Sequence, residues 1–144
     1  MITADLQDIQ IKWSLEPARD GYYNGLMQFP DIKDRISNDW SDRNGTDVLY
    51  GAGLLKAKEF TMSFLCGDTK DPTTKIVTSA YSNYISFLKY MVAHPTVSWY
   101  DGVLNQTFIL EYLSCSSFNR YITHNLFAIK VREANPNTRI NPVV

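Results

Sequence analysis

One helical stretch set among strand-like stretches most constrains how this chain can fold. Apolar residues recur at helical spacing from about 77 to 93, where Thr78 or Ser79 can cap the beginning and His94-Pro95 ends the run. The other patterned stretches alternate apolar and polar residues, as half-buried strands do. Because a parallel sheet needs several crossover helices, we predict a mainly β (α+β) fold: an antiparallel β-barrel or sandwich flanked by one long helix.

Strand-like stretches follow one another along most of the chain. The predicted strands are 7–15, 36–40, 46–50, 56–66, 96–100, 103–114 and 120–132, and 18–31 is predicted as a loop or a pair of short strands. The dipeptides Asn44-Gly45 and Asp101-Gly102 are typical of hairpin turns, because their backbones accept the positive φ that such turns require. We therefore expect hairpins at both places.

The length of 144 residues suits one core rather than two. Aromatic residues make up 13% of the chain, which favours sheet. We expect a single domain at 1–133, with an extended arm at about 19–50 and an extended tail at 134–144.

The charge distribution argues against several kinds of partner. The net charge is −1 and no cluster of basic residues is present, which disfavours sequence-specific nucleic-acid binding. The first residues lack the apolar core of a signal peptide, and no run of about 18 apolar residues exists that could span a membrane. We expect a soluble protein that is made in a cytoplasm.

No catalytic signature stands out, so we predict no enzymatic activity, cofactor or metal. A phosphate-binding glycine loop, a nucleophile elbow and paired Cys-x-x-Cys motifs are all missing from the sequence. His94 is expected to interact with the end of the helix, and His124 to lie in the last strand. Cys66 and Cys115 are expected to be buried free thiols, with a disulfide as the alternative.

The densest group of oxygen ligands lies at Asp39, Asp42, Asn44 and Asp47. It shares part of its spacing with a calcium loop but lacks the distal glutamate that would supply two oxygens. Capping of a turn explains these side chains better than calcium binding.

Four aromatic residues fall in or beside the turn-rich arm, at Tyr22, Tyr23, Phe29 and Trp40. They can pack as a lid over one end of a barrel, within the same chain. Alternatively, a neighbouring subunit contacts them, since Tyr and Trp are common anchors of interfaces.

Three stretches together resemble a known group of proteins: an arm and strand, LEPARDGYYNGLMQFPDIKDRISNDWSDRNGTDVL followed by KAKEFTMSFLCG; a helix, SAYSNYISFLKYMV; and a hairpin, TVSWYDGVLNQTFILEYLSCSSF. Over about residues 15–133 they are similar to small tail proteins of phages and prophages of Bacteroides-type bacteria. Those are similar in turn to the N-terminal barrel domain of distal tail proteins and to tail-tube subunits.

This resemblance implies a structural protein of the virion tail, present in the bacterial host cytoplasm before assembly. Copies would form a ring, commonly six-fold, around a conduit through which DNA passes, and other tail proteins would bind the ring. A ring of this kind needs two different complementary surfaces on each subunit. The candidate contact residues are Tyr22, Tyr23, Phe29, Trp40, Asn44 and Gly45 in the arm, and Pro136 and Ile140 in the tail.

The sequence departs from a full distal tail protein because it shows no second, C-terminal domain. A tube subunit, a ring adaptor and a tail-completion protein therefore stay open. Two other classes also stay open: a small barrel that binds an apolar ligand, and a hydrolase or isomerase that uses Asp or Tyr side chains.

Overall fold

The computed structural model describes residues 1–33, 37–38, 47–48 and 55–136. Seven strands form one antiparallel sheet in the order β2-β1-β9-β10-β11-β6-β3. Their bounds are β1 (Ile2–Ala4), β2 (Gln7–Asp8), β3 (Leu15–Pro17), β6 (Lys58–Cys66), β9 (Val97–Asp101), β10 (Gln106–Arg120) and β11 (Asn125–Glu133). The helices are α1 (Ile9–Trp13), α2 (Asp20–Met27) and α3 (Ala80–Ala93). The predicted mainly β, antiparallel fold with a flanking helix is confirmed.

The long strand β10 belongs to both halves of the sheet. Its first part, Gln106 to Leu110, pairs with β9, and its second part, Glu111 to Arg120, pairs with β11. The register against β11 shifts twice, between Tyr112 and Ser114 and between Cys115 and Ser117. Such irregularities bend a strand and increase its twist, so β10 can turn from one half of the sheet into the other.

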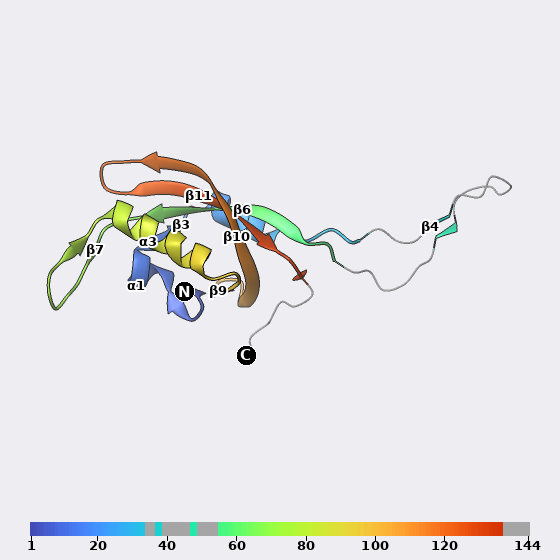
Figure 1. Cartoon of the computed structure of the whole chain (residues 1–144), viewed down its shortest axis with the longest axis horizontal. Coiled ribbons are helices and arrows are strands. Elements are labelled where there is room, and N and C mark those ends of the chain that lie inside the picture. Colours follow the sequence, from blue (N-terminus) through green and yellow to red (C-terminus); the bar gives the residue numbers. More distant parts are fainter. Residues whose placement is uncertain (34–36, 39–46, 49–54, 137–144) are drawn as a thin grey trace.

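Helix α3 lies across the sheet in Figure 1 and begins and ends close to the predicted bounds. The hydroxyl of Ser79 accepts a hydrogen bond from the Ser82 N–H at 3.2 Å and caps the helix, as predicted. Residues 77–78 belong instead to β8 (Val77–Thr78), which pairs with β7 (Thr69–Lys70). The inner face of α3 buries Tyr84, Phe87 and Met91.

Aromatic rings fill the space between α3 and the sheet. Phe64, at the middle of β6, lies 5.6 to 5.8 Å between ring centroids from each of four rings. These rings are Tyr22, Phe87, Trp99 and Phe127. Edge-on and tilted pairs at these distances are favourable in addition to the burial of their area. The core therefore joins α2, α3 and both halves of the sheet.

The prediction of a strand at 7–15 is wrong. The Asp8 carboxylate caps a short helix by accepting from the Gln10 N–H at 2.9 Å, and Ser14 ends it in a left-handed conformation with φ 54°. Ile9 and Trp13 are buried one helical turn apart, whereas Ile11 between them is 80% exposed. Apolar residues at every second position also include pairs that are four positions apart, which is the spacing of one helical turn. The Asp8 cap favours the helix over the strand.

The prediction of a loop or short strands at 18–31 is also wrong, because α2 occupies most of this range. Its glycines permit close packing rather than turns. A Cβ atom on Gly25 would lie 2.8 Å from the Thr61 carbonyl oxygen, and one on Gly21 would lie 2.8 Å from Ser63 Oγ. The helix therefore packs with its backbone directly on β6.

The hairpin at Asp101-Gly102 is confirmed, and its strands differ from the predicted ones in their ends. β10 continues to Arg120 and β11 begins at Asn125, so His124 lies in the turn before the last strand and not within it. In that turn the Tyr121 N–H donates to the His124 carbonyl at 2.9 Å. The predicted strands in the arm appear in part as β4 (Ser37–Asn38) paired with β5 (Asp47–Val48). The predicted turn at 41–45 lies outside the described residues.

Candidate functional site

Tyr22 belongs to the core and not to an exposed contact surface. Its hydroxyl donates to Asp101 Oδ2 at 2.9 Å and accepts from Trp99 Nε1 at 2.9 Å. Burial raises the pKa of Tyr22 well above its usual value, and the charge of Asp101 adds to this. Since its side chain is fully buried, Tyr22 cannot meet a neighbouring subunit in this structure, and we remove it from the candidate contacts.

Tyr23 is half-buried and packs against this core. Its ring stands edge-on to Tyr22 at 4.7 Å, and it lines a shallow cleft with Met1, Ile2 and Val103. Burial raises the pKa of Tyr23 above its usual value. Tyr23 therefore packs against the core with part of its ring and leaves the rest accessible to another molecule.

Phe29 is the exposed aromatic residue at the base of the arm, with 70% of its surface accessible. Because α2 packs on β6, the predicted arm at about 19–50 can leave the body only after α2. The two sides of this arm lie together near Phe29, where the Lys56 N–H donates to the Asp31 carbonyl at 2.7 Å and Ile32 pairs with Leu55. Nearby, the buried Lys58 ammonium donates to the carbonyls of Leu26 and Gln28 at the end of α2. A cation at this position also complements the helix dipole, so the base of the arm is firmly held.

The other predicted contact residues divide into two groups. Pro136 is described and is buried. Trp40, Asn44, Gly45 and Ile140 lie outside the described residues, as do Asp39 and Asp42 of the oxygen-rich group. The chain pairs antiparallel with itself at two places here, between β4 and β5 and between Ile32 and Leu55.

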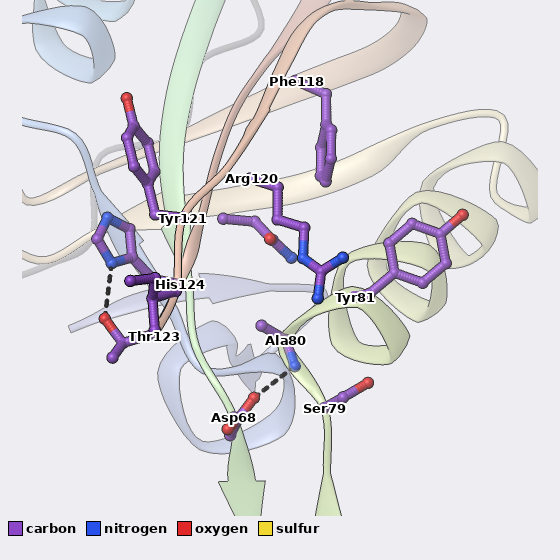
Figure 2. Close-up of a pocket in the computed structure, with 11 residues that line it drawn as sticks. Asp68, Ser79, Ala80, Tyr81, Phe118, Arg120, Tyr121, Thr123 and His124 are labelled. Carbon is purple, nitrogen blue, oxygen red and sulfur yellow. Dashed lines mark hydrogen bonds between the residues drawn. The ribbon is translucent and has the colours of Figure 1, made fainter.

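A surface that the sequence analysis missed lies where the β10–β11 turn faces the beginning of α3. A cavity of about 500 Å³ is open there. It is lined by Asp68, Ser79, Ala80, Tyr81, Phe118, Arg120, Tyr121, Ile122, Thr123, His124 and Asn125. Figure 2 shows the Arg120 guanidinium extending between Phe118 and Tyr81 toward the first residues of α3.

Two buried asparagines at this end of the molecule differ in their partners. Asn83, on α3, donates to the Gly67 carbonyl at 2.9 Å and holds the helix against the end of β6. Asn125, at the start of β11, is 3% exposed, and its Nδ2 has no hydrogen-bond partner among the described residues. Buried polar groups almost always have a hydrogen-bond partner, so an unpaired one can indicate a binding site. Nothing in the sequence distinguishes these two asparagines.

The thiols and histidines have structural surroundings. Cys66 and Cys115 are both free, as expected, but only Cys66 is buried, whereas Cys115 is half-buried. The Cys66 thiol is directed at the carbonyls of Trp13 and Ala80. His94 stacks on Tyr90 with 4.0 Å between ring centroids, and its Nδ1 lies 2.8 Å from the Tyr90 carbonyl oxygen at the end of α3. Within the described ranges, no three His, Cys, Asp or Glu side chains gather in a way that could hold a metal ion.

The helices of the described part of the chain are too short or too polar to cross a membrane.

Comparison with known proteins gives one structural likeness. The Dit protein of phage SPP1, whose crystal structure is described as a paradigm of the hub adsorption apparatus in phages that infect Gram-positive bacteria, matches this chain with a TM-score of 0.56. The match covers 98% of this chain and 51% of that protein, with 11% sequence identity. This chain therefore spans about half the length of Dit.

Comparison by sequence adds no relative. No protein-family model matches the chain, and no curated protein matches it. What the likeness shows is the fold: nearly all of this chain is built like about half of the Dit protein of phage SPP1.

Proposed function

We propose that this protein is a structural subunit of a phage, prophage or phage-like tail, where copies assemble into a ring around the tail conduit. One observation carries the proposal: nearly the whole chain has the fold of about half of a phage hub protein, at a TM-score of 0.56. The resemblance of the sequence to small tail proteins points the same way. Within this class, a distal tail protein, a tube subunit and a ring adaptor all fit a single β domain at 1–133 with an arm.

The arm supplies one of the two surfaces that a ring contact requires. Its base is fixed to the body by Lys58 and by the hydrogen bond from Lys56 to Asp31, and it carries the exposed ring of Phe29. Further along, Trp40 can serve as an interface anchor, as Trp often does. We retain Tyr23, Phe29, Trp40, Asn44, Gly45 and Ile140 as proposed contacts, and a six-fold ring as the expected stoichiometry. Pro136 is set aside, as Tyr22 is, because it is buried within the subunit.

The chain's charge suits a conduit for DNA. A net charge of −1 offers no strong attraction to phosphates, so DNA could pass without being held. The conduit would therefore make no sequence-specific contacts with DNA.

The alternative of an apolar ligand inside the barrel has less support. Such a site needs an open interior, but here the interior is filled by Phe64 and the rings around it. The alternative of a hydrolase or isomerase has no observation in its favour, since the buried Asp101 is already bonded to Tyr22 and to the Val103 N–H.

The proposal is tested by measuring association between copies. Light scattering and chemical cross-linking of the purified protein over a range of concentrations should show an oligomer of defined size. Replacing Phe29 or Trp40 with alanine should weaken association while the melting temperature changes little, because Phe29 at least makes few contacts within the subunit. Strictly monomeric behaviour at high concentration, with and without partner tail proteins, would contradict a ring-forming role.

A further inference from the structure

Asn125 lines a cavity, although its unpaired Nδ2 is itself buried just behind the cavity surface. Asn125 is held on both sides by the sheet, where it pairs with Cys66 of β6 and with Arg120 of β10. Its side chain lines the cavity beside the β10–β11 turn. An acceptor oxygen in this cavity would complete the hydrogen bonding of Asn125 Nδ2 once a small shift of the lining exposes that atom.

Arg120 provides a second polar group for which the described part of the chain shows no ion-pair partner. Figure 2 shows its guanidinium directed into the same space. Guanidinium groups bind carboxylates through paired, charge-assisted hydrogen bonds. The two groups together favour a ligand that carries a carboxylate and a further acceptor oxygen.

Exposed apolar side chains surround these polar groups. Tyr81, Phe118, Tyr121 and Ile122 are all exposed, and Phe118 lies 4.6 Å between ring centroids from Tyr84 of α3. Clusters of aromatic side chains beside an arginine are typical of interface anchor sites. The ligand should therefore also bring a large apolar group.

Asp68 also lines the cavity, and its negative charge disfavours the binding of a small free anion. Its carboxylate accepts from the Ala80 N–H at 2.7 Å, at the positive end of the α3 dipole. Its charge would still repel a phosphate or sulfate that moves freely in the cavity. A polypeptide can instead place one carboxylate at Arg120 and keep the rest of its charge away from Asp68.

We propose that this cavity receives the arm of a second copy of the chain, through residues 36–48. This segment contains Asp39, Asp42 and Asp47 against a single basic residue, Arg43, and it carries Trp40 between two of the aspartates. It thus combines the carboxylate, the acceptor oxygens and the large apolar group that the cavity favours. The inference rests on the proposed function and names the surface that accepts the arm.

The positions of the two surfaces fit a head-to-tail contact. Figure 1 shows β4, within the arm, at one end of the molecule, and the β10–β11 turn toward the other end. A contact between unlike surfaces at opposite ends leaves a pair of copies with one free arm and one free cavity, so that further copies can add. Repetition of such a contact produces a ring when the rotation closes.

A charge exchange in the full-length protein tests this contact. Arg120→Glu should weaken association between copies at least tenfold, measured by sedimentation over a concentration series. The triple variant Arg120→Glu, Asp39→Lys, Asp42→Lys should recover most of the wild-type association. Arg132→Glu is the matched control, because Arg132 is an exposed arginine of the same hairpin that does not line the cavity, and it should associate as the wild type does.

A second measurement does not depend on assembly. A synthetic peptide of residues 36–48 is added to isotope-labelled full-length protein, and the side-chain amide signals of Asn125 and Asn83 are followed by NMR. The Asn125 signal should shift at saturable peptide concentrations, while that of Asn83, which already has its partner, should stay in place. A peptide with Trp40→Ala should bind at least tenfold more weakly.

The outcomes separate this inference from the proposed function. If Arg120→Glu associates as the wild type does while Trp40→Ala does not, the ring proposal stands and the cavity is not the acceptor. If the triple variant stays dissociated and the peptide leaves Asn125 unshifted, another molecule occupies the cavity and the inference is wrong. If the wild type is monomeric but the peptide shifts Asn125, the acceptor site is supported and the ring proposal is contradicted.

Discussion

The hydroxyl of Tyr22 donates a hydrogen bond of 2.9 Å to Asp101, a residue 79 positions further along the chain. The same hydroxyl accepts from Trp99, and the other Asp101 oxygen accepts from the N–H groups of Val103 and Leu104. This buried network links α2 to the β9–β10 hairpin. Each polar group in it has a partner, which is the condition under which buried polar groups stabilise a fold.

Tyr22→Phe should lower the free energy of unfolding by about 1–3 kcal/mol, because it leaves buried groups of Asp101 and Trp99 without a partner. Urea denaturation measures the loss. Tyr100→Phe is the control, since the Tyr100 hydroxyl bonds to Asn105 at an exposed site and its removal should cost much less. Equal losses in the two variants would mean that the buried network adds nothing beyond an ordinary surface hydrogen bond.

Gly25→Ala should destabilise the protein although alanine favours helices over glycine by about 1 kcal/mol. The new methyl group would lie 2.8 Å from the Thr61 carbonyl and 3.1 Å from the Phe60 Cβ, so α2 must move away from β6. Overpacking of this kind typically costs about 1–3 kcal/mol. Thermal denaturation checks the sign, and a higher melting temperature for the variant would show that α2 is free to shift.

Ser79→Ala should cost about 1 kcal/mol, because it removes the side chain that caps α3. Ser86→Ala, at an exposed position in the middle of the same helix, should leave stability unchanged or slightly raised, since alanine is the better helix former. Chemical denaturation of both variants tests the cap. A smaller loss at Ser79 than at Ser86 would contradict it.

Stability should fall as the pH rises above about 9. Burial, with a smaller effect of Asp68, raises the pKa of the Cys66 thiol to about 12, whereas an unfolded thiol titrates near 8.5. Between these values the unfolded chain loses a proton that the folded chain keeps, so the free energy of unfolding decreases as pH increases. Burial also raises the pKa of Tyr90 to about 12, which acts in the same direction at somewhat higher pH.

Urea denaturation at pH 8, 9.5 and 11 measures this decline. Cys66→Ala should show a shallower decline than the wild type, because one of the titrating groups is gone, even if its stability at pH 8 is lower. An identical slope in the two proteins would mean that the Cys66 thiol does not contribute.

The long patterned elements could be predicted because one local signal specified each of them. β6 has 9 residues and α3 has 14, each with a consistent hydrophobic period. The Asp101-Gly102 dipeptide predicts a hairpin because both residues accept the backbone angles of a tight turn. Shorter elements could not be predicted in this way. The apolar residues of 7–15 fit either period, and the glycines of α2 looked like turn residues because their close neighbours in β6 are more than 30 positions away.

The predicted contact residues were also wrong where burial depends on residues that are distant in the sequence. Aromatic content alone placed Tyr22 with the exposed residues of the arm, although its partners Trp99 and Asp101 lie in a distant hairpin. Arg120 and Asn125 were not predicted as site residues, because no sequence pattern indicates that a polar group will lack a partner beside a helix end.

The sequence by itself determined the class of the fold: alternating strands with one well-capped helix can bury their apolar faces only as a sheet covered by that helix. The tertiary structure decided which side chains are available at the surface. Burial and hydrogen bonding depend on residues that meet only after folding, as Tyr22 meets Asp101 in the core and as Asn125, flanked by Cys66 and Arg120, is left with a free donor. Local patterns specify elements, and long-range contacts specify sites.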